Sequence, residues 1–197
     1  GHIFLKSLDL ELTWLPFITK PLPILVLLYL LQKNYRNFAL GRWFFLGMLA
    51  SVFGDVFLIF PGGFALGVIA FLAAHLFYIS GMRLVCLRPN WPALILLLVF
   101  ATGFVFALWN QLGPWRFLLL AYIMTIVLMA SYAARFLEQN RNMTATYCFL
   151  AALLFVCSDT LLAIQMFAEV TWLDGYVMAT YYLAQGLFTL FVASFCR

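Results

Sequence analysis

Residues 146–168 read TYCFLAALLFVCSDTLLAIQMFA, a stretch in which Asp159 is the only charged side chain. About 20 apolar residues at 1.5 Å rise each cross the roughly 30 Å hydrocarbon core of a bilayer. Including this segment, the chain holds seven such stretches, at about 14–31, 43–60, 64–81, 91–109, 115–135, 146–168 and 175–195. They predict an all-α polytopic transmembrane bundle of seven helices, which forms a single domain over residues 1–197 without a soluble domain.

The composition also indicates a chain embedded in lipid. Of the 197 residues, 66% are hydrophobic and 9% are charged, whereas a soluble domain carries roughly 25% charged residues. The four cysteines, Cys86, Cys148, Cys157 and Cys196, form no C-x-x-C pair, which argues against a disulfide framework or cysteine-bound zinc. The net charge of +4 comes from scattered basic residues. We therefore expect membrane lipids as partners and no nucleic acid.

Basic residues set the expected orientation in the membrane. One side of the predicted bundle holds Lys33, Arg36, Arg42, Arg83, Arg88, Arg135, Arg141 and Arg197. The other side holds Lys6, Lys20, Arg116, Glu169 and Asp174. By the positive-inside rule the first side is cytoplasmic, and the carboxyl terminus lies there. We expect the inner (cytoplasmic) membrane of a bacterium.

Four ionisable residues lie within the predicted spans, where each costs a few kcal/mol and indicates function by default. They are Lys20, Asp55, His75 and Asp159. At 1.5 Å per residue, all four fall between roughly 7 and 17 Å below the outer surface. Because they come from four helices at a similar depth, they predict one shared polar pocket.

Polar side chains at neighbouring positions extend this predicted pocket. The candidate donors are Tyr122, Tyr181, Tyr182 and Gln185. Tyr122 belongs to a polar and aromatic stripe at helical spacing, and small residues before Asp55 allow close helix approach. The span 91–109 carries nothing comparable, so we expect it to be a lipid-facing support.

Each ionisable residue also has a structural interpretation. Lys20 can reach the interface as a plain anchor, and His75 can be a core histidine bonded to a neighbouring carbonyl. The two aspartates can form an Asp–Lys or Asp–His packing network. A proton-coupled transporter or channel is a further alternative, since relays of such residues suit it.

Two buried carboxyl groups are suited to acid–base chemistry. Burial favours the neutral form of a carboxyl group and a nearby cation favours the charged form, so the two can serve as acid and base. The chain has no G-x-S-x-G or H-E-x-x-H motif, and only His75 lies inside the predicted bundle. If the chain is an enzyme, we therefore expect it to work with carboxylates and water rather than with a serine nucleophile or bound zinc, and we expect no cofactor.

The order of short motifs along the chain resembles the YhhN family. The motifs are Thr19-Lys20-Pro21-Leu22, Gly54-Asp55, Phe71 to His75 with Tyr78, Tyr122, Ser158-Asp159, and Tyr182 with Gln185. The resemblance covers about residues 18 to 190. Each motif is weak alone, and their order on successive helices makes the match specific. Family members usually have eight helices, whereas residues 1–13, with three charged side chains, form no convincing helix.

The resemblance implies a lysoplasmalogenase, which hydrolyses the vinyl-ether bond of a lysophospholipid substrate to a fatty aldehyde and glycerophosphoethanolamine or glycerophosphocholine. It implies Asp55 and Asp159 as the acid–base pair and leaves open which is the acid. The residues expected to orient water and the glycerol hydroxyl are His75, Tyr122, Tyr182 and Gln185. Lys20 is expected to tune a carboxylate or meet the phosphate. The alternative is a small transporter or lipid-binding protein that uses the same residues without bond cleavage.

Overall fold

The computed structural model describes residues 21–197, and within this range every regular element is a helix. The α-helices are α2 (Leu22–Tyr35), α3 (Ala39–Ile59), α4 (Phe64–Met82), α5 (Trp91–Leu108), α6 (Arg116–Asn140), α7 (Met143–Phe167) and α8 (Asp174–Phe195). Short 3-10 turns, η1 (Gly113–Trp115) and η2 (Thr171–Leu173), precede α6 and α8. In the described range, six helices, α3 to α8, are long and apolar enough to cross a membrane. The chain is an integral membrane protein with an all-α polytopic bundle.

Several helices extend beyond the predicted apolar stretches at their polar ends. Helix α3 begins at Ala39 rather than at 43, and α6 continues to Asn140 rather than to 135. Asn90 and Asn142 cap α5 and α7, because each side chain accepts a hydrogen bond from the backbone N–H three residues later. An apolar stretch marks the part of a helix in hydrocarbon, whereas the helix itself continues into the headgroup region, where polar side chains cap it.

The first predicted span, 14–31, lies only partly in the described range. Helix α2 begins at Leu22 and continues to Tyr35. Its 14 described residues are fewer than the roughly 20 that cross a bilayer. Residues 1–20, which include Lys20, lie outside the described residues.

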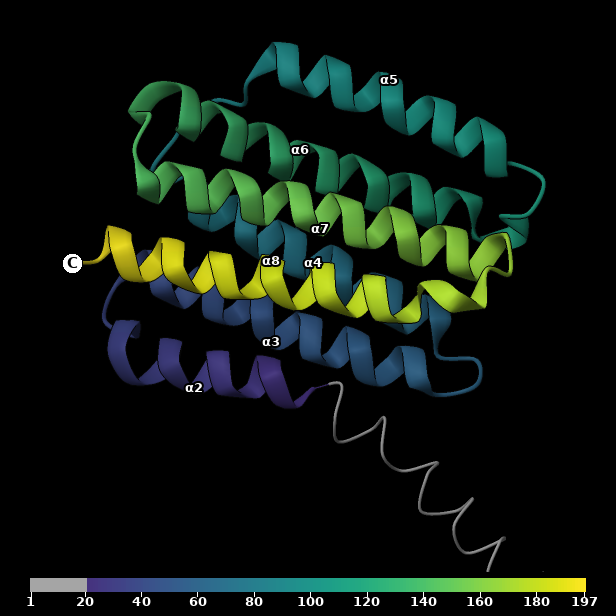
Figure 1. Ribbon diagram of the computed structural model, residues 1–197, viewed down its shortest axis with the longest axis horizontal. Coiled ribbons are helices and arrows are strands. Elements are labelled where there is room, and N and C mark those ends of the chain that lie inside the picture. The colour runs from purple at the N-terminus through teal and green to yellow at the C-terminus, as the bar shows by residue number, and fades with distance from the viewer. Residues whose placement is uncertain (1–20) are drawn as a thin grey trace, which may run out of the picture.

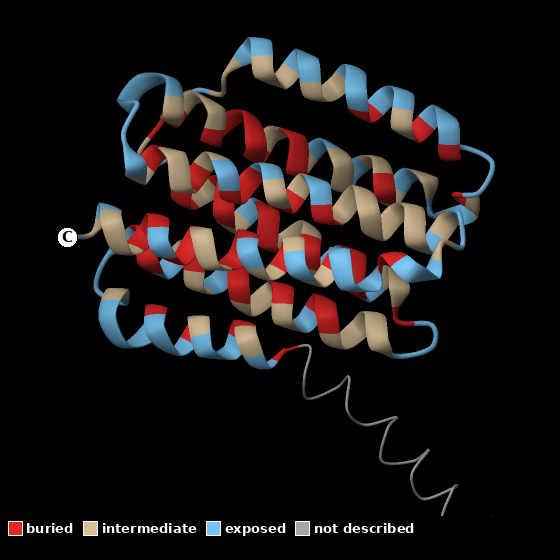
Figure 2. Ribbon diagram, in the orientation of Figure 1, coloured by how far each residue is buried: buried red, intermediate tan, exposed pale blue. Residues whose placement is uncertain are grey.

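Five helices, α3, α4, α6, α7 and α8, form the body of the bundle, and α2 and α5 lie at its edges (Figure 1). Helix α2 packs on α3 and α8, and α5 packs on α6. Figure 2 shows buried positions concentrated in the body, whereas α5 is mostly exposed. The prediction that the span 91–109 is a lipid-facing support is therefore confirmed.

Aromatic side chains fill one half of the core. The ring centroid of Phe44 lies 5.2 Å from Tyr78, 5.3 Å from Phe188 and 5.4 Å from Phe191. We call these four fully buried residues the aromatic cluster. Pairs of this kind contribute about 0.5–1.5 kcal/mol each beyond their buried area. Gly47 on α3 lies directly against the Tyr78 ring, so a larger residue there would push α3 and α4 apart.

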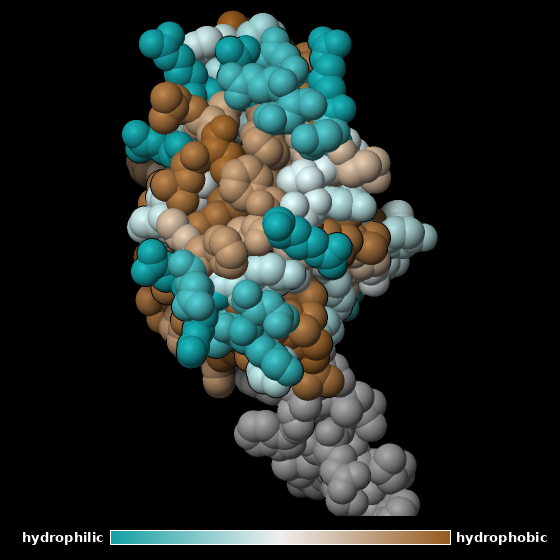
Figure 3. Space-filling model, turned by 90° about the vertical axis from the view of Figure 1, so that its left-hand side faces the viewer, coloured by the Kyte–Doolittle hydropathy of each residue, from teal (hydrophilic) through white to brown (hydrophobic). Residues whose placement is uncertain are grey.

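The two ends of the bundle differ in charge. The helix bounds place all eight basic residues of the predicted cytoplasmic side at the end where α3, α5 and α7 begin. We call this the basic end. Figure 3 looks onto it and shows hydrophilic side chains spread around hydrophobic ones. The opposite end carries Arg116, Glu169 and Asp174 among its described residues.

Candidate active site

Two aspartate–tyrosine pairs lie inside the bundle. Tyr122 on α6 donates a hydrogen bond to Oδ2 of Asp159 on α7, with 2.5 Å between the oxygens. Tyr181 on α8 donates to Oδ2 of Asp55 on α3 over 2.8 Å. Asp55 is 8% exposed and the Asp159 side chain 14%. The first pair joins the consecutive helices α6 and α7 and the second joins α3 to α8, which are distant in sequence; each pair holds its carboxyl group in a fixed place.

His75 on α4 lies beside the first of these pairs. Its Nε2 is 3.9 Å from Oδ2 of Asp159, which is too long for a hydrogen bond. The ring is fully buried and packs edge-on against Tyr122 and Phe155, with centroids 5.1 Å and 4.9 Å away. Neither ring nitrogen has a hydrogen bond that meets strict geometric criteria, although the backbone of Phe71, one helical turn earlier, interacts with the ring. His75 lines neither cavity, so it borders the Tyr122–Asp159 pair from inside the core.

Two cavities meet at Asp159. The polar cavity, of about 260 Å³, is lined by Asp55, Asp159, Tyr181 and Gln165 together with apolar side chains. The apolar cavity, of about 100 Å³, lies between α4, α5, α6 and α7. Its lining is hydrocarbon apart from Tyr122, Asp159 and Thr160. Asp159 therefore borders a polar space on one side and an apolar space on the other.

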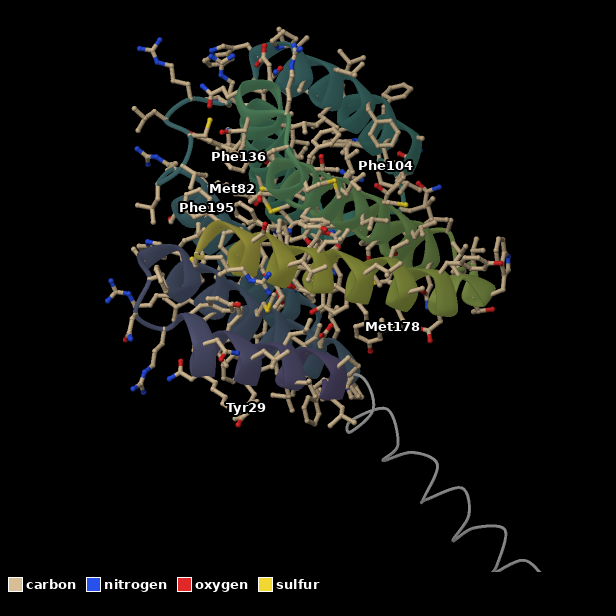
Figure 4. All side chains as sticks on the ribbon, turned by 60° about the vertical axis from the view of Figure 1, so that its left-hand side comes forward. Tyr29, Met82, Phe104, Phe136, Met178 and Phe195 are labelled. Atoms are coloured by element: carbon tan, nitrogen blue, oxygen red, sulfur yellow. The ribbon has the colours of Figure 1, made fainter. Side chains whose placement is uncertain are left out.

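Figure 4 labels one residue of each cavity, Met178 of the polar cavity and Phe104 of the apolar cavity. Met178 comes from α8 and Phe104 from α5, so the two cavities draw part of their linings from different helices. The lining of the polar cavity includes Ile59, the last residue of α3, and Asp174, the first residue of α8. This cavity therefore lies toward the end opposite the basic end.

Gln185 lies deeper in the bundle than the two carboxyl groups. Its Oε1 accepts a hydrogen bond from Tyr78 over 2.7 Å, and both residues are 0% exposed. Its Nε2 has no hydrogen-bond partner among the described residues. Gln185 does not line either cavity. It lies one helical turn after Tyr181 on the buried face of α8, and a role in orienting a bound molecule stays a prediction.

Tyr181, one of the predicted donors, is the tyrosine of α8 whose hydrogen bond to Asp55 is described above. Its neighbour Tyr182 is partly buried and lines neither cavity, and its role in the site stays a prediction. The helical period places Tyr181 on the inward face. Tyr181 lies four residues before Gln185, and Val177, Tyr181, Gln185 and Phe188 form one buried stripe. That stripe is the signal in the sequence that identifies Tyr181.

The structure thus brings together Asp55, Asp159, His75 and Tyr122 of the predicted site residues. Lys20 lies outside the described residues. Among residues 21–197 no group of three or more His, Cys, Asp or Glu side chains is placed to hold a metal ion. The arrangement can deliver a proton from one carboxyl group and activate water with another, at the border of a polar and an apolar space.

Comparison with known proteins identifies the family of this chain. The sequence profile of the YhhN family matches residues 15–192. The chain belongs to the YhhN family. The match includes every helix that contributes a side chain to the two cavities.

Relatives of this YhhN-family chain include mammalian and bacterial proteins. The chain is 33% identical to "Lysoplasmalogenase TMEM86B" of Sus scrofa, over 94% of this chain and 78% of the relative. It is also 33% identical to the Homo sapiens protein of the same name, over 91% of this chain and 76% of the relative. "Uncharacterized membrane protein YhhN" of Escherichia coli O157:H7 is 30% identical over 59% of this chain and 58% of its own length. No solved structure matches the chain.

Proposed function

We propose that this YhhN-family protein is a lysoplasmalogenase, which hydrolyses the vinyl-ether bond of a lysoplasmalogen to a fatty aldehyde and glycerophosphoethanolamine or glycerophosphocholine. Two relatives at 33% identity carry that name. The structural observation that carries the proposal is the position of Asp159 where the two cavities meet. A lysoplasmalogen has its reactive bond at the same kind of border, between a polar glycerophosphate and a hydrocarbon chain.

The chemistry of a vinyl ether determines which carboxyl group serves as the acid. Hydrolysis begins with protonation of the alkene carbon on the chain side, and this leaves an oxocarbenium ion at the carbon bonded to oxygen. Asp159 borders the apolar cavity, where the chain carbons would lie, whereas Asp55 lines only the polar cavity. In this proposal Asp159 therefore donates the proton, and Asp55 activates water on the headgroup side.

The reaction takes two steps, and every proton that one carboxyl group gives up is replaced by the end. First, Asp159 transfers its proton to carbon, the alkene π electrons form the new C–H bond, and Asp55 takes a proton from the water that attacks the oxocarbenium ion. The product is a hemiacetal. In the second step Asp55 returns its proton to the glycerol oxygen as the C–O bond breaks, and Asp159 accepts the hemiacetal hydroxyl proton. Aldehyde and glycerophospholipid leave, and both carboxyl groups have regained their first states.

The neighbouring side chains orient this pair. Tyr122 occupies one oxygen of Asp159, so the other oxygen carries the proton toward the substrate. Tyr181 holds Asp55 in the same way. His75 lies 3.9 Å from Asp159 and packs on Tyr122, and we propose that it holds this pair in position from behind, since it lines neither cavity. We propose Lys20, outside the described residues, as a partner of the phosphate or of a carboxylate.

The proposed orientation places the polar cavity near the outer surface of the membrane. By the positive-inside rule, the basic end and the carboxyl terminus lie in the cytoplasm. The polar cavity lies toward the opposite end. A headgroup bound there would stay near the outer headgroup layer while its chain reaches into the bilayer. We propose a bacterial inner membrane as the location.

Aldehyde release by the purified protein tests this function. Lysoplasmenylethanolamine is incubated with the protein in deuterated water, and the aldehyde is analysed by mass spectrometry. We expect an aldehyde with a single deuterium on the carbon next to the carbonyl, since that carbon receives the solvent-derived proton of Asp159. The matched control is the ester analogue with the same chain, from which no chain product is expected.

Two outcomes would contradict the proposal. Release from the ester at a similar rate would indicate a different hydrolase. Binding of the vinyl-ether lipid without cleavage, by protein whose helix content is intact, would favour the alternative of a lipid-binding protein or transporter.

A further inference from the structure

Helix α5 is attached to the bundle along one side. It packs on α6, and its buried residues are Ala101, Val105 and Leu108. Figures 1 and 2 show it at the edge of the bundle with most of its surface exposed. Its outward side chains are apolar, with Leu96 69% and Phe106 84% exposed, and therefore face lipid. A helix that packs on a single neighbour forms a wall that can separate from that neighbour at low cost.

The seam between α5 and α6 holds a groove of about 450 Å³. The groove is lined by apolar side chains and by Thr102. It shares Ala101, Val105 and Ile123 with the apolar cavity. The apolar cavity in turn shares Asp159 with the polar cavity. The three spaces therefore lie side by side in the order polar cavity, apolar cavity and groove, with shared wall residues between them; we call this row of spaces the path.

The volume of the apolar cavity indicates that a long hydrocarbon chain bound there must also extend into the groove. Pockets that enclose a drug-sized ligand measure about 300–1,000 Å³. The apolar cavity, at about 100 Å³, is too small to enclose a whole fatty chain. The groove has the additional volume that a chain needs, and its surface is as apolar as the bilayer beside it.

We infer that the hydrocarbon chain of the lysophospholipid substrate lies in the groove between α5 and α6, so that substrate enters sideways from the bilayer, and that Ala101 limits the passage. The inference rests on the proposed function for the identity of the chain. The path is polar at one end, apolar at the other and carries one carboxyl group where the two parts meet. A single-chain amphiphile matches that sequence of surfaces, whereas a second protein copy on α5 would not reach Asp159.

A chain-length comparison tests the role of Ala101. This residue is 8% exposed and lines both the groove and the apolar cavity. In Ala101→Phe we expect kcat/KM for a long-chain lysoplasmalogen to fall by about tenfold or more, as a lost chain contact does in other pockets. We expect kcat/KM for a short-chain, water-soluble analogue to stay near the wild-type value. The matched control is Val99→Phe on the outer face of α5, where Val99 is 67% exposed, and it should leave both substrates unchanged.

A binding measurement keeps the inference testable if Ala101→Phe fails to fold. Wild-type protein in vesicles is exposed to a lysophosphatidylcholine with a diazirine in the middle of its acyl chain, and adducts are mapped by mass spectrometry. We expect adducts on Phe106, Leu120 or Met124, which line the groove. Unlabelled lysoplasmenylcholine should compete with the probe.

The outcomes separate this inference from the proposed function. Groove adducts in protein that releases no aldehyde would support the chain site and contradict the hydrolase. Normal aldehyde release with adducts elsewhere, or equal losses for long and short chains in Ala101→Phe, would overturn the chain site alone. Crosslinked dimers through α5 in place of lipid adducts would show a second copy in the groove and would also overturn it.

Discussion

The aromatic cluster and the two cavities are built from the same helices but differ in packing. Helix α3 contributes Phe44 to the cluster and Asp55 to the polar cavity, and α8 contributes Phe188 and Tyr181 in the same way. In the cluster, rings fill the space between helices completely. Around the carboxyl groups, the same helices enclose space for a bound molecule.

The difference shows how a small bundle can hold reacting groups in place. Close packing resists small shifts, so the cluster fixes α3, α4 and α8 relative to one another. The hydrogen bond from Tyr78 to Gln185 lies between the two regions. It joins the cluster to α8, on which Tyr181, one helical turn before Gln185, donates to Asp55. Helices fixed in this way can hold the two carboxyl groups in position while the cavities beside them stay open for a bound molecule.

The largest expected effect separates chemistry from packing. In Asp55→Asn we expect aldehyde release to fall by about 10²–10⁴-fold, the usual contribution of a general base. Thermal stability should change little, because the amide oxygen still accepts the hydrogen bond from Tyr181. Glu138→Gln, an exposed carboxyl group at the basic end, is the matched control and should retain full activity. Full activity in Asp55→Asn would exclude it as the base.

A substitution in the aromatic cluster should mainly lower stability. Phe188→Ala removes a fully buried ring and should lower the free energy of unfolding by roughly 3–5 kcal/mol. The measurement is steric trapping or thermal unfolding in mild detergent. Leu190→Ala, on the lipid-facing side of α8 at 49% exposure, should cost far less. Equal losses in the two variants would show that the cluster is not the tightly packed region.

Two glycine substitutions should change stability in opposite directions. Gly47→Ala places a methyl group against the Tyr78 ring and should destabilise by about 1–3 kcal/mol through overpacking. Gly103→Ala on α5 meets no other atom within 4 Å. It should stabilise by about 0.5–1 kcal/mol through helix propensity. Thermal unfolding of both variants checks the signs, and a stabilised Gly47→Ala would contradict close packing of α3 on α4.

The smallest expected effect distinguishes two neighbouring tyrosines. Tyr181→Phe removes the hydrogen bond to Asp55 and should lower kcat by about tenfold or more, since a hydrogen bond to a charged group contributes about 1.5–3 kcal/mol. The kcat of Tyr182→Phe should stay within about twofold of the wild-type value. Aldehyde release under saturating substrate provides the comparison. A greater loss in Tyr182→Phe would assign Tyr182, rather than Tyr181, to the reacting groups.

The helices could be predicted because a bilayer of fixed thickness requires long apolar stretches. Asp55, His75 and Asp159 could be predicted because ionisable side chains inside such stretches are costly and rarely incidental. Their common depth followed from the fixed rise of a helix.

The remaining features depend on side-chain packing. Lipid is as apolar as a core, so hydrophobicity does not show which face of a membrane helix points inward. Tyr181 and Tyr182 were therefore hard to separate, although the buried stripe through Gln185 distinguishes them in the structure. The cavities, and the position of Asp159 between them, arise from contacts among α4, α5, α6 and α7 that no single stretch of sequence encodes.

The most direct test of the central claim is a single-turnover assay of aldehyde release by wild type and Asp159→Asn in vesicles, with lysoplasmenylethanolamine as substrate. We expect both proteins to bind the substrate and the bond-cleavage rate of the variant to fall by about 10²-fold or more. Cleavage at the wild-type rate by Asp159→Asn would contradict the claim that this carboxyl group delivers the proton.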